Sequence, residues 1–282
     1  MNILTFDVEQ WFHILDHPSS ASPKEWVNKE YRLDKNMDRI LTFLDEKNQK
    51  ATFFVLGWVA KKYPHIVKRL DDLGYELATH SHMHQLAYTQ TREEFSEDLK
   101  LSIESIENIS GKKVTIYRVP GFSIKDENKW AFEEIYKAGI EIDCSVFPSS
   151  RNHGGFCEYN YAKPSLLKIN GYTLKELPIN LFTFFGRDLI FSGGGYFRFF
   201  PYWCIKYLTK NSDYVMTYFH PRDFDKDVPV PEGLSAVRRW KFKVGVESAF
   251  DKFKQYVNDF EFIDIAEADK SIDWENVKKI VV

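Results

Sequence analysis

The sequence predicts an α/β protein built on a parallel sheet, either open or closed into a barrel. Apolar, strand-like segments alternate with helix-like segments through residues 2–147, and the alternation resumes after residue 200. Units of this βα kind build parallel sheets. The chain has 282 residues, and single α/β barrels commonly reach that size. We therefore predict one domain over residues 1–282.

The expected elements follow one another closely along the chain. Strands are expected at 2–6, 51–57, 75–79, 114–118 and 140–147, with helices at 34–48, 59–74, 91–111 and near 127–138. The helix at 91–111 is the clearest, because its apolar residues recur every three or four positions and Gly111 follows as a natural stop.

Residues 149–200 interrupt this rhythm. The segment is rich in Gly, Asn, Ser and aromatic residues, which predicts an irregular insertion with short strands. Beyond it we expect a helix at 201–208, a strand at 214–220, a helix near 237–257 and a last strand at 260–265.

Composition argues against several classes of partner. A formal net charge of −3 gives no basic footprint, so nucleic acid is not an expected partner. No apolar run approaches the roughly 18 residues of a membrane span, and the first residues lack the pattern of a signal peptide. Three widely spaced cysteines form no metal or disulfide pattern. We therefore expect a cytoplasmic protein without stable membrane insertion; its oligomeric state is left open.

Three histidines in five positions, within the stretch "LATHSHMHQL" (77–86), indicate a metal site. In a helical turn, positions i and i+4 share a face while i+2 points away. On that geometry His80 and His84 would bind one ion and His82 would not. A third ligand should be an anion, because catalytic zinc sites commonly have three protein ligands and one open position.

The stretch "TFDVEQ" (5–10) offers that anion at the end of the first strand. Asp7 and Glu9 point to the same face of a strand, although a solvated loop start would also explain the pair. Polar residues end other predicted strands as well, namely Arg118, Asp143 and His220. Barrel enzymes assemble their sites at the C-terminal ends of parallel strands, so this convergence predicts an active site.

These residues resemble the polysaccharide deacetylases of the NodB-homology type, which form family 4 of the carbohydrate esterases. The motif T-F-D-D is similar to "TFDVE" (5–9), H-[ST]-x-x-[HD] to "HSHMH" (80–84), R-x-P-x to "RVPG" (118–121), and the fifth motif to "YFH" (218–220). Order and placement match over roughly 1–147 and 214–225. The stretch "SGGGYFRFFPYW" (192–203) resembles a segment of the D-V-E branch, which is linked to bacterial surface-polysaccharide biosynthesis.

The resemblance implies a deformed (β/α) barrel that carries one divalent metal and removes the acetyl group of an N-acetylated sugar. His80 and His84 would be metal ligands, Asp7 the general base and Arg118 the residue that orients it. Zinc is the expected ion, and a His₂–carboxylate set also accepts Co²⁺, Ni²⁺ or Fe²⁺.

The resemblance also assigns two further roles. His220 would be the general acid, and a backbone N–H near Gly121 would hold the oxyanion. The family's tryptophan-bearing fourth motif is absent, and Asp143 is its loose counterpart. That carboxylate would brace Arg118 or His220, with a surface or capping role as the alternative.

One departure concerns the third ligand. The second Asp of T-F-D-D is Val8 here. Branches with D-x-[DE] place the ligand two residues after the base, and Glu9 occupies that position. The strand geometry independently allows it.

Aromatic residues near the motifs are candidates for sugar contact. Trp11, with Phe12 and His13, is expected at the mouth of the site, and Tyr196 is expected to stack on a sugar. The glycines of 192–203 could let backbone approach the sugar. A tight loop followed by a core-facing aromatic helix is the alternative.

The predicted function is therefore a metal-dependent hydrolase that removes an N-acetyl group from an amino sugar. The sugar would belong to a surface polysaccharide or to its nucleotide-linked or lipid-linked precursor. Three alternatives remain at this point: a deformylase or O-deacetylase on the same scaffold, a non-catalytic sugar-binding homologue, and a structural protein with incidental histidines.

Overall fold

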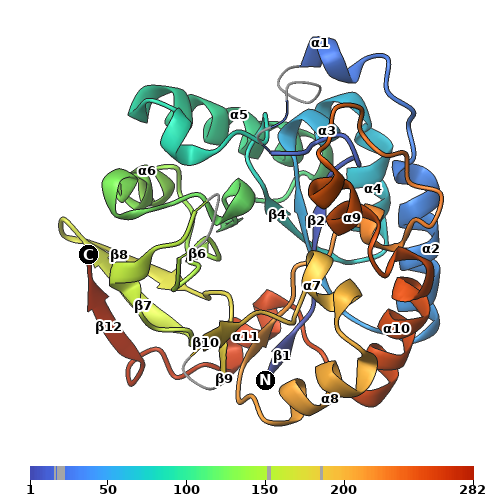
Figure 1. The fold of residues 1–282 in the computed structure, drawn as a ribbon. Helices are drawn as coiled ribbons and strands as arrows, with labels where there is room; N and C mark the ends of the chain where they lie inside the picture. The colour runs from blue at the N-terminus through green and yellow to red at the C-terminus, as the bar shows by residue number, and fades with distance from the viewer. Residues whose placement is uncertain (16, 18–22, 151–153, 185–186) are drawn as a thin grey trace.

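A mostly parallel sheet with helices packed around it forms the centre of the protein (Figure 1). The computed structural model describes residues 1–15, 17, 23–150, 154–184 and 187–282. Eight strands follow the spatial order β12-β7-β8-β6-β5-β4-β3-β2, and only the β7–β8 pair is antiparallel. Their bounds are β2 Thr5–Val8, β3 Thr52–Val55, β4 Glu76–Thr79, β5 Ile116–Tyr117, β6 Ile142–Asp143, β7 Ser165–Ile169, β8 Tyr172–Glu176 and β12 Lys278–Val281.

The sheet bends into a deformed α/β barrel that stays open. At one edge, β1 (Asn2–Ile3) pairs in parallel with β11 (Val215–Met216), and a single bridge joins Phe6 to Phe219. At the other edge β12 pairs only with β7, so among the described residues no ladder joins β12 to β11. The strands β9 (Phe182–Phe184) and β10 (Arg187–Leu189) form a separate antiparallel pair. The predicted fold class is confirmed, without a closed barrel.

Helices pack around the sheet, most of them against its outer face, while α11 packs with the second apolar cluster described below. They are α1 Pro23–Trp26, α2 Leu33–Glu46, α3 Gly57–Lys62, α4 Pro64–Asp72, α5 Arg92–Ser110, α6 Ala131–Lys137, α7 Gly194–Phe199, α8 Tyr202–Lys210, α9 Ala236–Lys243, α10 Val246–Asp259 and α11 Ile265–Ser271. The helix α5 begins at a capping box between Thr91 and Glu94 and ends at Gly111, whose φ is 67°. None of the described helices is both long and apolar enough to cross a membrane.

Alternation along the strands separates two cores. Phe6 and Phe53 stack at 5.1 Å between their ring centroids and pack with the outer helices. Phe54, next along β3, belongs instead to the second apolar cluster, together with Ala78 and Ile116 from neighbouring strands. Because successive strand residues point to opposite faces, the two clusters lie on opposite sides of the sheet. The same face as Phe54 also carries the buried polar residues Thr5, Asp7 and Thr52.

Several predicted elements differ in detail. The helix expected at 59–74 is two helices because Pro64 starts a new one, and the helix near 237–257 breaks at Gly245, whose φ is 69°. The strand expected at 260–265 reduces to one bridge at Ile263, because α11 begins at Ile265. Within the irregular 149–200 segment, β7 and β8 join the main sheet. The strand β12 was not predicted.

Candidate active site

The end of β2 places two carboxylates on one side of the barrel. Asp7 pairs in register with Phe54 of β3, and Glu9 follows directly after the strand. Both side chains are buried, with exposed fractions of 3% and 1%. A solvated loop start therefore does not describe this pair, since buried carboxylates require charged or hydrogen-bonding partners.

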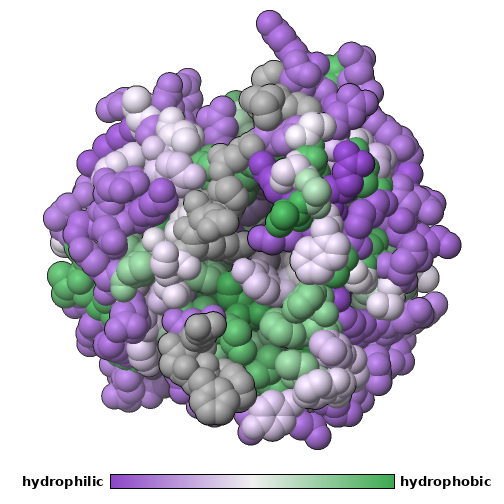
Figure 2. Space-filling view, viewed as in Figure 1, coloured by the Kyte–Doolittle hydropathy of each residue, from purple (hydrophilic) through white to green (hydrophobic). Residues whose placement is uncertain are grey.

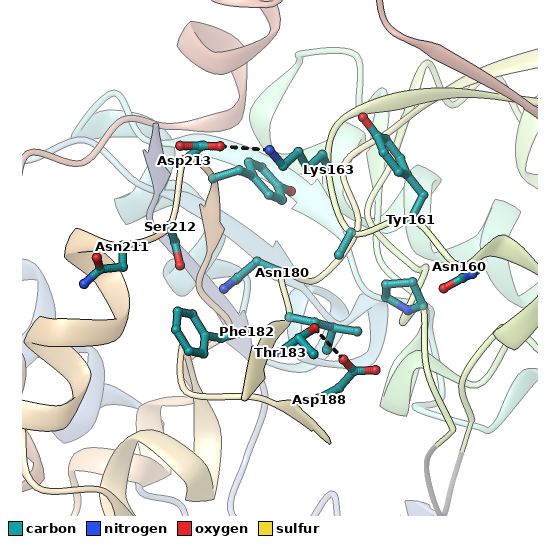
Figure 3. A pocket seen from close by; sticks show the side chains of 14 residues that line it. Asn160, Tyr161, Lys163, Asn180, Phe182, Thr183, Asp188, Asn211, Ser212 and Asp213 are labelled. Carbon is teal, nitrogen blue, oxygen red and sulfur yellow. Dashed lines mark hydrogen bonds and ion pairs between the residues drawn. The ribbon is translucent and has the colours of Figure 1, made fainter. Parts of the chain in front are cut away.

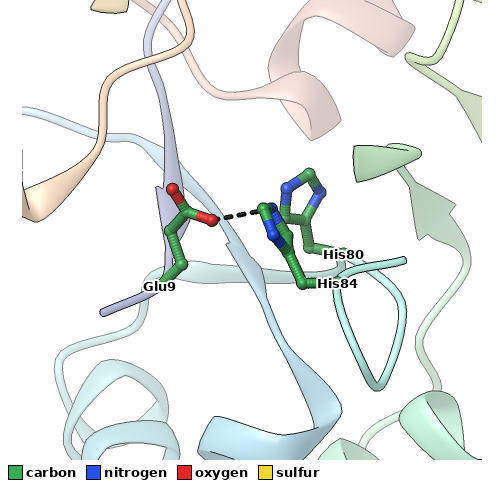
Figure 4. Close-up of side chains that lie close together, drawn as sticks. All are labelled: Glu9, His80 and His84. Atoms are coloured by element: carbon green, nitrogen blue, oxygen red, sulfur yellow. Dashed lines mark ion pairs between the residues drawn. The ribbon is translucent and has the colours of Figure 1, made fainter. Parts of the chain in front are cut away.

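Glu9, His80 and His84 form a cluster with the spacing of a metal site. One ligand atom from each residue lies within 4.8 Å of the others, and Figure 4 shows the three side chains converging from β2 and from the loop after β4. His84 Nε2 lies 2.7 Å from Glu9 Oε2. His80 donates its Nδ1 hydrogen to the Arg118 carbonyl at 2.8 Å, which leaves Nε2 for another partner.

A tight loop, not a helix, brings the two histidines together. Residues 80–84 have no helical structure, and Ser81 and His84 adopt left-handed φ values of 67° and 53°. The His84 amide donates to Ser81 Oγ at 3.1 Å, which closes the loop. The helical i, i+4 reasoning from the sequence was therefore wrong, although the pairing it predicted is present.

Asp98 of α5 holds this loop in shape. Its carboxylate accepts hydrogen bonds from the backbone amides of His82 at 2.7 Å and Met83 at 2.9 Å. The His82 ring points away from the cluster and packs against Gly57, where an added Cβ would lie 2.4 Å from its Nδ1. Sequence reasoning missed Asp98. In the sequence it is one acidic residue among several on the polar side of a predicted helix, and nothing marks it as a partner of the histidine loop.

Charge keeps Glu9 ionised. Burial raises its pKa, but Arg222 and His84 outweigh burial and hold that pKa well below the usual value. Arg222 Nη1 lies 2.9 Å from Glu9 Oε1. Neither Glu9 oxygen makes a regular hydrogen bond within the described structure. Sequence reasoning also missed Arg222. It lies in the 3-10 turn Pro221–Phe224, a segment too short to show apolar periodicity.

Asp7 is anchored by a buried arginine. Arg118, fully buried at the end of β5, donates from Nη1 to Asp7 Oδ1 at 2.7 Å and to Thr5 Oγ1 at 2.8 Å. Its guanidinium carbon lies 4.0 Å from the centroid of the Phe54 ring. Burial raises the pKa of Asp7, and Arg118 with nearby histidines lowers it by more, so the net shift is downward. This is the arrangement predicted for the two residues.

His220 lies against both carboxylates. Its Nε2 is 3.8 Å from Asp7 Oδ2 and 3.7 Å from Glu9 Oε1. Its Nδ1 pairs with Asp223 Oδ2 at 2.9 Å, and Asp223 in turn lies 3.1 Å from Arg198 Nε. Burial lowers the pKa of His220, but Asp223 raises it by more, so the net shift is upward.

Asp143 is an internal brace. It is fully buried, so the surface alternative was wrong. Its Oδ1 accepts from Ser145 Oγ at 2.6 Å, and Ser145 Oγ accepts from the Val119 amide at 2.9 Å. The link to Arg118 is therefore indirect, through the neighbouring backbone. Asp143 also pairs with Glu176, and burial raises the pKa of Asp143 to about 6 and that of Glu176 well above its usual value.

The proposed sugar contacts divide into buried and exposed groups. Trp11 is only 7% exposed and donates from its indole N–H to the Glu30 carbonyl at 2.8 Å, so it does not line a mouth. Phe12 and His13 are buried beside it. Tyr196 is 43% exposed on α7. Gly121 has a left-handed φ of 64° in the 3-10 turn that follows Arg118.

The glycines of "SGGG" approach the protein's own strand. A Cβ at Gly193 would lie 2.4 Å from the Tyr218 carbonyl oxygen, and one at Gly194 would lie 3.8 Å from His220 Cε1. The close approach expected toward a sugar is therefore made to the segment that carries His220. These two glycines set α7 directly against the site.

A cavity of about 400 Å³ lies elsewhere, between the loop after β8 and the start of β11 (Figure 3). Asn180, Phe182 and the Lys163–Asp213 ion pair line it. None of the candidate site residues contributes to its wall.

Comparison with protein families decides the classification. Residues 4–142 match the family described as polysaccharide deacetylase. This half of the chain belongs to that family. The matched segment contains Glu9, His80, His84, Asp7 and Arg118. Residues 144–270, which contain His220, match a domain of unknown function, DUF3473.

Curated relatives share only about a third of the chain. A peptidoglycan-N-acetylglucosamine deacetylase of Bacillus cereus is 32% identical over 97 residues, which is 34% of this chain and 35% of that protein. The peptidoglycan-N-acetylmuramic acid deacetylase PdaA of Bacillus subtilis is 24% identical over 114 residues, 38% and 43% of the two chains. The matched segment thus spans less than half of each of these two relatives.

Solved structures extend the similarity to the whole fold. A protein of Mycobacterium smegmatis described as a candidate polysaccharide deacetylase matches with a TM-score of 0.68 at 17% identity, over 99% of this chain and 92% of that one. Puue allantoinase matches with a TM-score of 0.54 at 14% identity, over 83% and 71%. At such identities the likeness concerns the fold alone.

Proposed function

We propose that this polysaccharide deacetylase is a metal-dependent hydrolase that removes an N-acetyl group from an amino sugar. The sugar belongs to a surface polysaccharide or to its nucleotide-linked or lipid-linked precursor. The observation that carries the proposal is the conjunction of three groups at one end of the barrel. They are the Glu9–His80–His84 cluster, the Asp7–Arg118 pair and the His220–Asp223 pair.

The donor set fits a divalent ion of the zinc type. Two imidazoles and a carboxylate are typical ligands of a catalytic zinc site, and Co²⁺, Ni²⁺ and Fe²⁺ accept the same set. The Glu9 oxygens are buried without regular hydrogen bonds. The backbone hydrogen bond of His80 uses Nδ1, so Nε2 remains available to bind an ion. A divalent ion held there would polarise the amide carbonyl and acidify water.

Asp7 acts as the general base. Its Oδ1 is held by Arg118, while Oδ2 faces His220 across 3.8 Å. Because the net shift of its pKa is downward, the carboxylate is ionised at neutral pH and accepts a proton from the attacking water at Oδ2. Arg118 keeps the other oxygen in place.

His220 acts as the general acid. Asp223 accepts the hydrogen on Nδ1, which stabilises the imidazolium and leaves the proton on Nε2 for the departing sugar amine. General acid catalysis of this kind typically contributes about 10²–10⁴-fold to a rate. Arg198 keeps Asp223 charged from the other side.

The substrate proposal rests on the relatives and on exposed groups near the site. The curated relatives are, by their names, deacetylases of N-acetylglucosamine or N-acetylmuramic acid in peptidoglycan. Tyr196, exposed on α7, is the proposed stacking residue, and the Gly121 amide the proposed oxyanion donor. Asp143 supports Arg118 through the backbone of Val119.

Two further statements belong to this proposal. Residues 1–282 form one catalytic domain, which is supported by β7, β8 and β12 completing the sheet begun by the N-terminal half. The reaction takes place in the cytoplasm, which is supported by the free thiols of Cys144, Cys157 and Cys204.

Product analysis tests the function. Zinc-loaded protein is incubated with N-acetylglucosamine oligomers, their N-formyl counterparts and O-acetylated sugars, and acetate, formate and free amine are measured by NMR. Acetate and amine in equal amounts, lost in Asp7→Asn, are expected. Formate alone would assign a deformylase, and acetate without amine an O-deacetylase. Bound metal with no product from any sugar would make the protein a non-catalytic homologue.

A further inference from the structure

Exposed aromatic side chains concentrate on three consecutive helices. Among the described residues, five of the six large aromatic side chains with high exposure lie on α7, α8 and α9. Trp203 is 73% exposed and Trp240 54%. With the exposed Val237 they form what we call the aromatic surface: Tyr196, Phe199, Trp203, Tyr207, Val237 and Trp240.

Exposed aromatic side chains of α7 and α9 touch each other, and those of α8 share one face of their helix. Phe199 of α7 contacts Trp240 of α9, with ring centroids 5.9 Å apart. Trp203 and Tyr207 share one face of α8, because they are four residues apart. Figure 1 draws α9, α7 and α8 one below the other, from right of the centre of the view down to its lower edge. In the same view, pale and green residues gather over this region while most of the rim is strongly hydrophilic (Figure 2).

Positive charge accompanies the aromatic side chains. The segment 233–246 contains four cations and no carboxylate, although the whole chain has a net charge of −3. Arg239 and Lys241 flank Trp240 and are exposed, and Lys210 is exposed at the end of α8. Lys206, by contrast, is paired with Asp259 at 2.7 Å.

The aromatic surface is held at the rim of the candidate active site. Arg198, on the buried side of α7, donates to the carbonyls of Phe242 and Val244 at 2.9 and 3.0 Å, which ties α7 to the end of α9. The same guanidinium pairs with Asp223, the partner of His220. The helix α9 has no buried residue. Phe242 packs partly against an internal apolar cluster, whereas Val237 and Trp240 stay 64% and 54% exposed.

We propose that the aromatic surface docks the protein on an anionic lipid bilayer, with the active site facing the membrane. Trp and Tyr side chains favour the membrane–water interface, where one end of the ring is apolar and the other is wet. Lys and Arg beside them are attracted to anionic headgroups. Given the function proposed above, a lipid-linked saccharide is then the natural form of the substrate.

The composition favours lipid over glycan or a second copy of the chain. Phe199 and Val237 have no polar atom to bond a sugar hydroxyl, and α9 offers no carboxylate or amide side chain. A face with unbalanced positive charge repels an identical face in a symmetric dimer. An anionic bilayer satisfies both the apolar and the charged groups.

Vesicle co-sedimentation of the full chain tests the proposal. Binding to phosphatidylcholine vesicles that contain phosphatidylglycerol is expected, with much weaker binding to phosphatidylcholine alone and weakening by salt. Arg239→Gln with Lys241→Gln should weaken binding roughly 30-fold, at about fivefold per cation. Trp203→Ala with Trp240→Ala should weaken it about tenfold or more. Circular dichroism verifies that each variant is folded.

A matched control removes two exposed lysines elsewhere, Lys47→Gln with Lys62→Gln, and should leave binding unchanged. Equal binding of both charge variants, or no binding by the parent chain, overturns the proposal. Two other outcomes would reassign the aromatic surface if the parent chain does not bind vesicles. Retention on insoluble chitin that the tryptophan variant loses would assign the surface to glycan. Self-association in light scattering that the same variant loses would assign it to a dimer. None of these measurements depends on turnover. The docking proposal can therefore fail while the proposed hydrolase activity stands, and the hydrolase proposal can fail while docking stands.

Discussion

His80 and Arg118 are joined by a 2.8 Å hydrogen bond from the histidine Nδ1 to the arginine carbonyl oxygen. The bond occupies Nδ1 and leaves Nε2 available to the cluster with Glu9 and His84. Its acceptor belongs to the residue whose guanidinium holds Asp7. A predicted metal ligand and the predicted base are therefore positioned by the same strand end. A substitution at either residue is therefore expected to shift the position of the other.

Replacing a single ligand should empty most of the metal site. His80→Ala, His84→Ala and Glu9→Gln are each expected to weaken metal affinity by at least the roughly 10–100-fold that a lost ligand-supporting residue costs. His82→Ala serves as the control, because only its backbone amide contacts Asp98. The metal-to-protein ratio after dialysis, by plasma mass spectrometry, measures the effect. Metal loss in the control with full retention in Glu9→Gln would show that the ligand set is wrong.

Asp7→Asn should separate catalysis from metal binding. The amide still offers an oxygen to Arg118 but cannot accept a proton, so kcat should fall by about 10²-fold or more while bound metal remains. Stability should also fall, because Arg118 becomes a buried cation without a counter-ion, a loss of about 3–5 kcal/mol when such pairs are broken. Steady-state kinetics and metal analysis are run on the same preparation. Normal turnover would remove Asp7 from the mechanism.

His220→Ala should harm amide hydrolysis more than hydrolysis of an activated ester. A sugar amine leaves only with a proton, whereas an aryl acetate releases a phenolate that needs none. We expect a loss of about 10²–10⁴-fold in kcat on an N-acetyl sugar and a clearly smaller loss on the ester. Equal losses on both substrates would mean that His220 does not protonate the leaving group.

The Asp143–Glu176 pair should make stability decline as the pH rises. Burial raises both pKa values, that of Asp143 to about 6, so the folded protein holds protons that the unfolded chain has released. This contribution to the free energy of unfolding is complete below the unfolded pKa values near 4 and is lost as the pH rises through the folded ones.

Glu176→Gln removes one of the two titrating groups and should flatten that decline. Urea unfolding of the metal-free protein between about pH 5 and about pH 8 measures it. Glu141→Gln is the control, because it removes an exposed carboxyl two residues before Asp143. Parallel pH profiles of Glu176→Gln and the unmodified chain would show that this buried pair does not cause the decline.

The strand ends were predictable because each apolar run stops at a polar residue, which is why Asp7, Arg118 and His220 could be named in advance. The distances and orientations between these residues could not be predicted from the sequence. The conformation of Ser81 and His84 depends on Asp98, and α5 supplies that carboxylate through a tertiary contact that local sequence does not encode. His80 and His84 do lie together, but a loop and not the expected helix brings them there.

The supporting charges were harder to foresee for a related reason. Arg222 lies in a 3-10 turn and Arg198 on a short helix, where periodicity gives little information about direction. Glu176 meets Asp143 only through the register of β6 and β8, which are separated by the irregular segment. Such contacts become visible once strands are paired in space.

The pairing of β1 with β11 has a consequence for synthesis of the chain. Glu9, His80 and His84 all emerge from the ribosome early, whereas the strand that completes the edge beside β2, and His220 with it, follows more than 130 residues after His84. At about 5–20 residues per second this interval lasts roughly ten seconds. During it the edge of β2 is still unpaired, and it is in this interval that the chain is most exposed to misassembly.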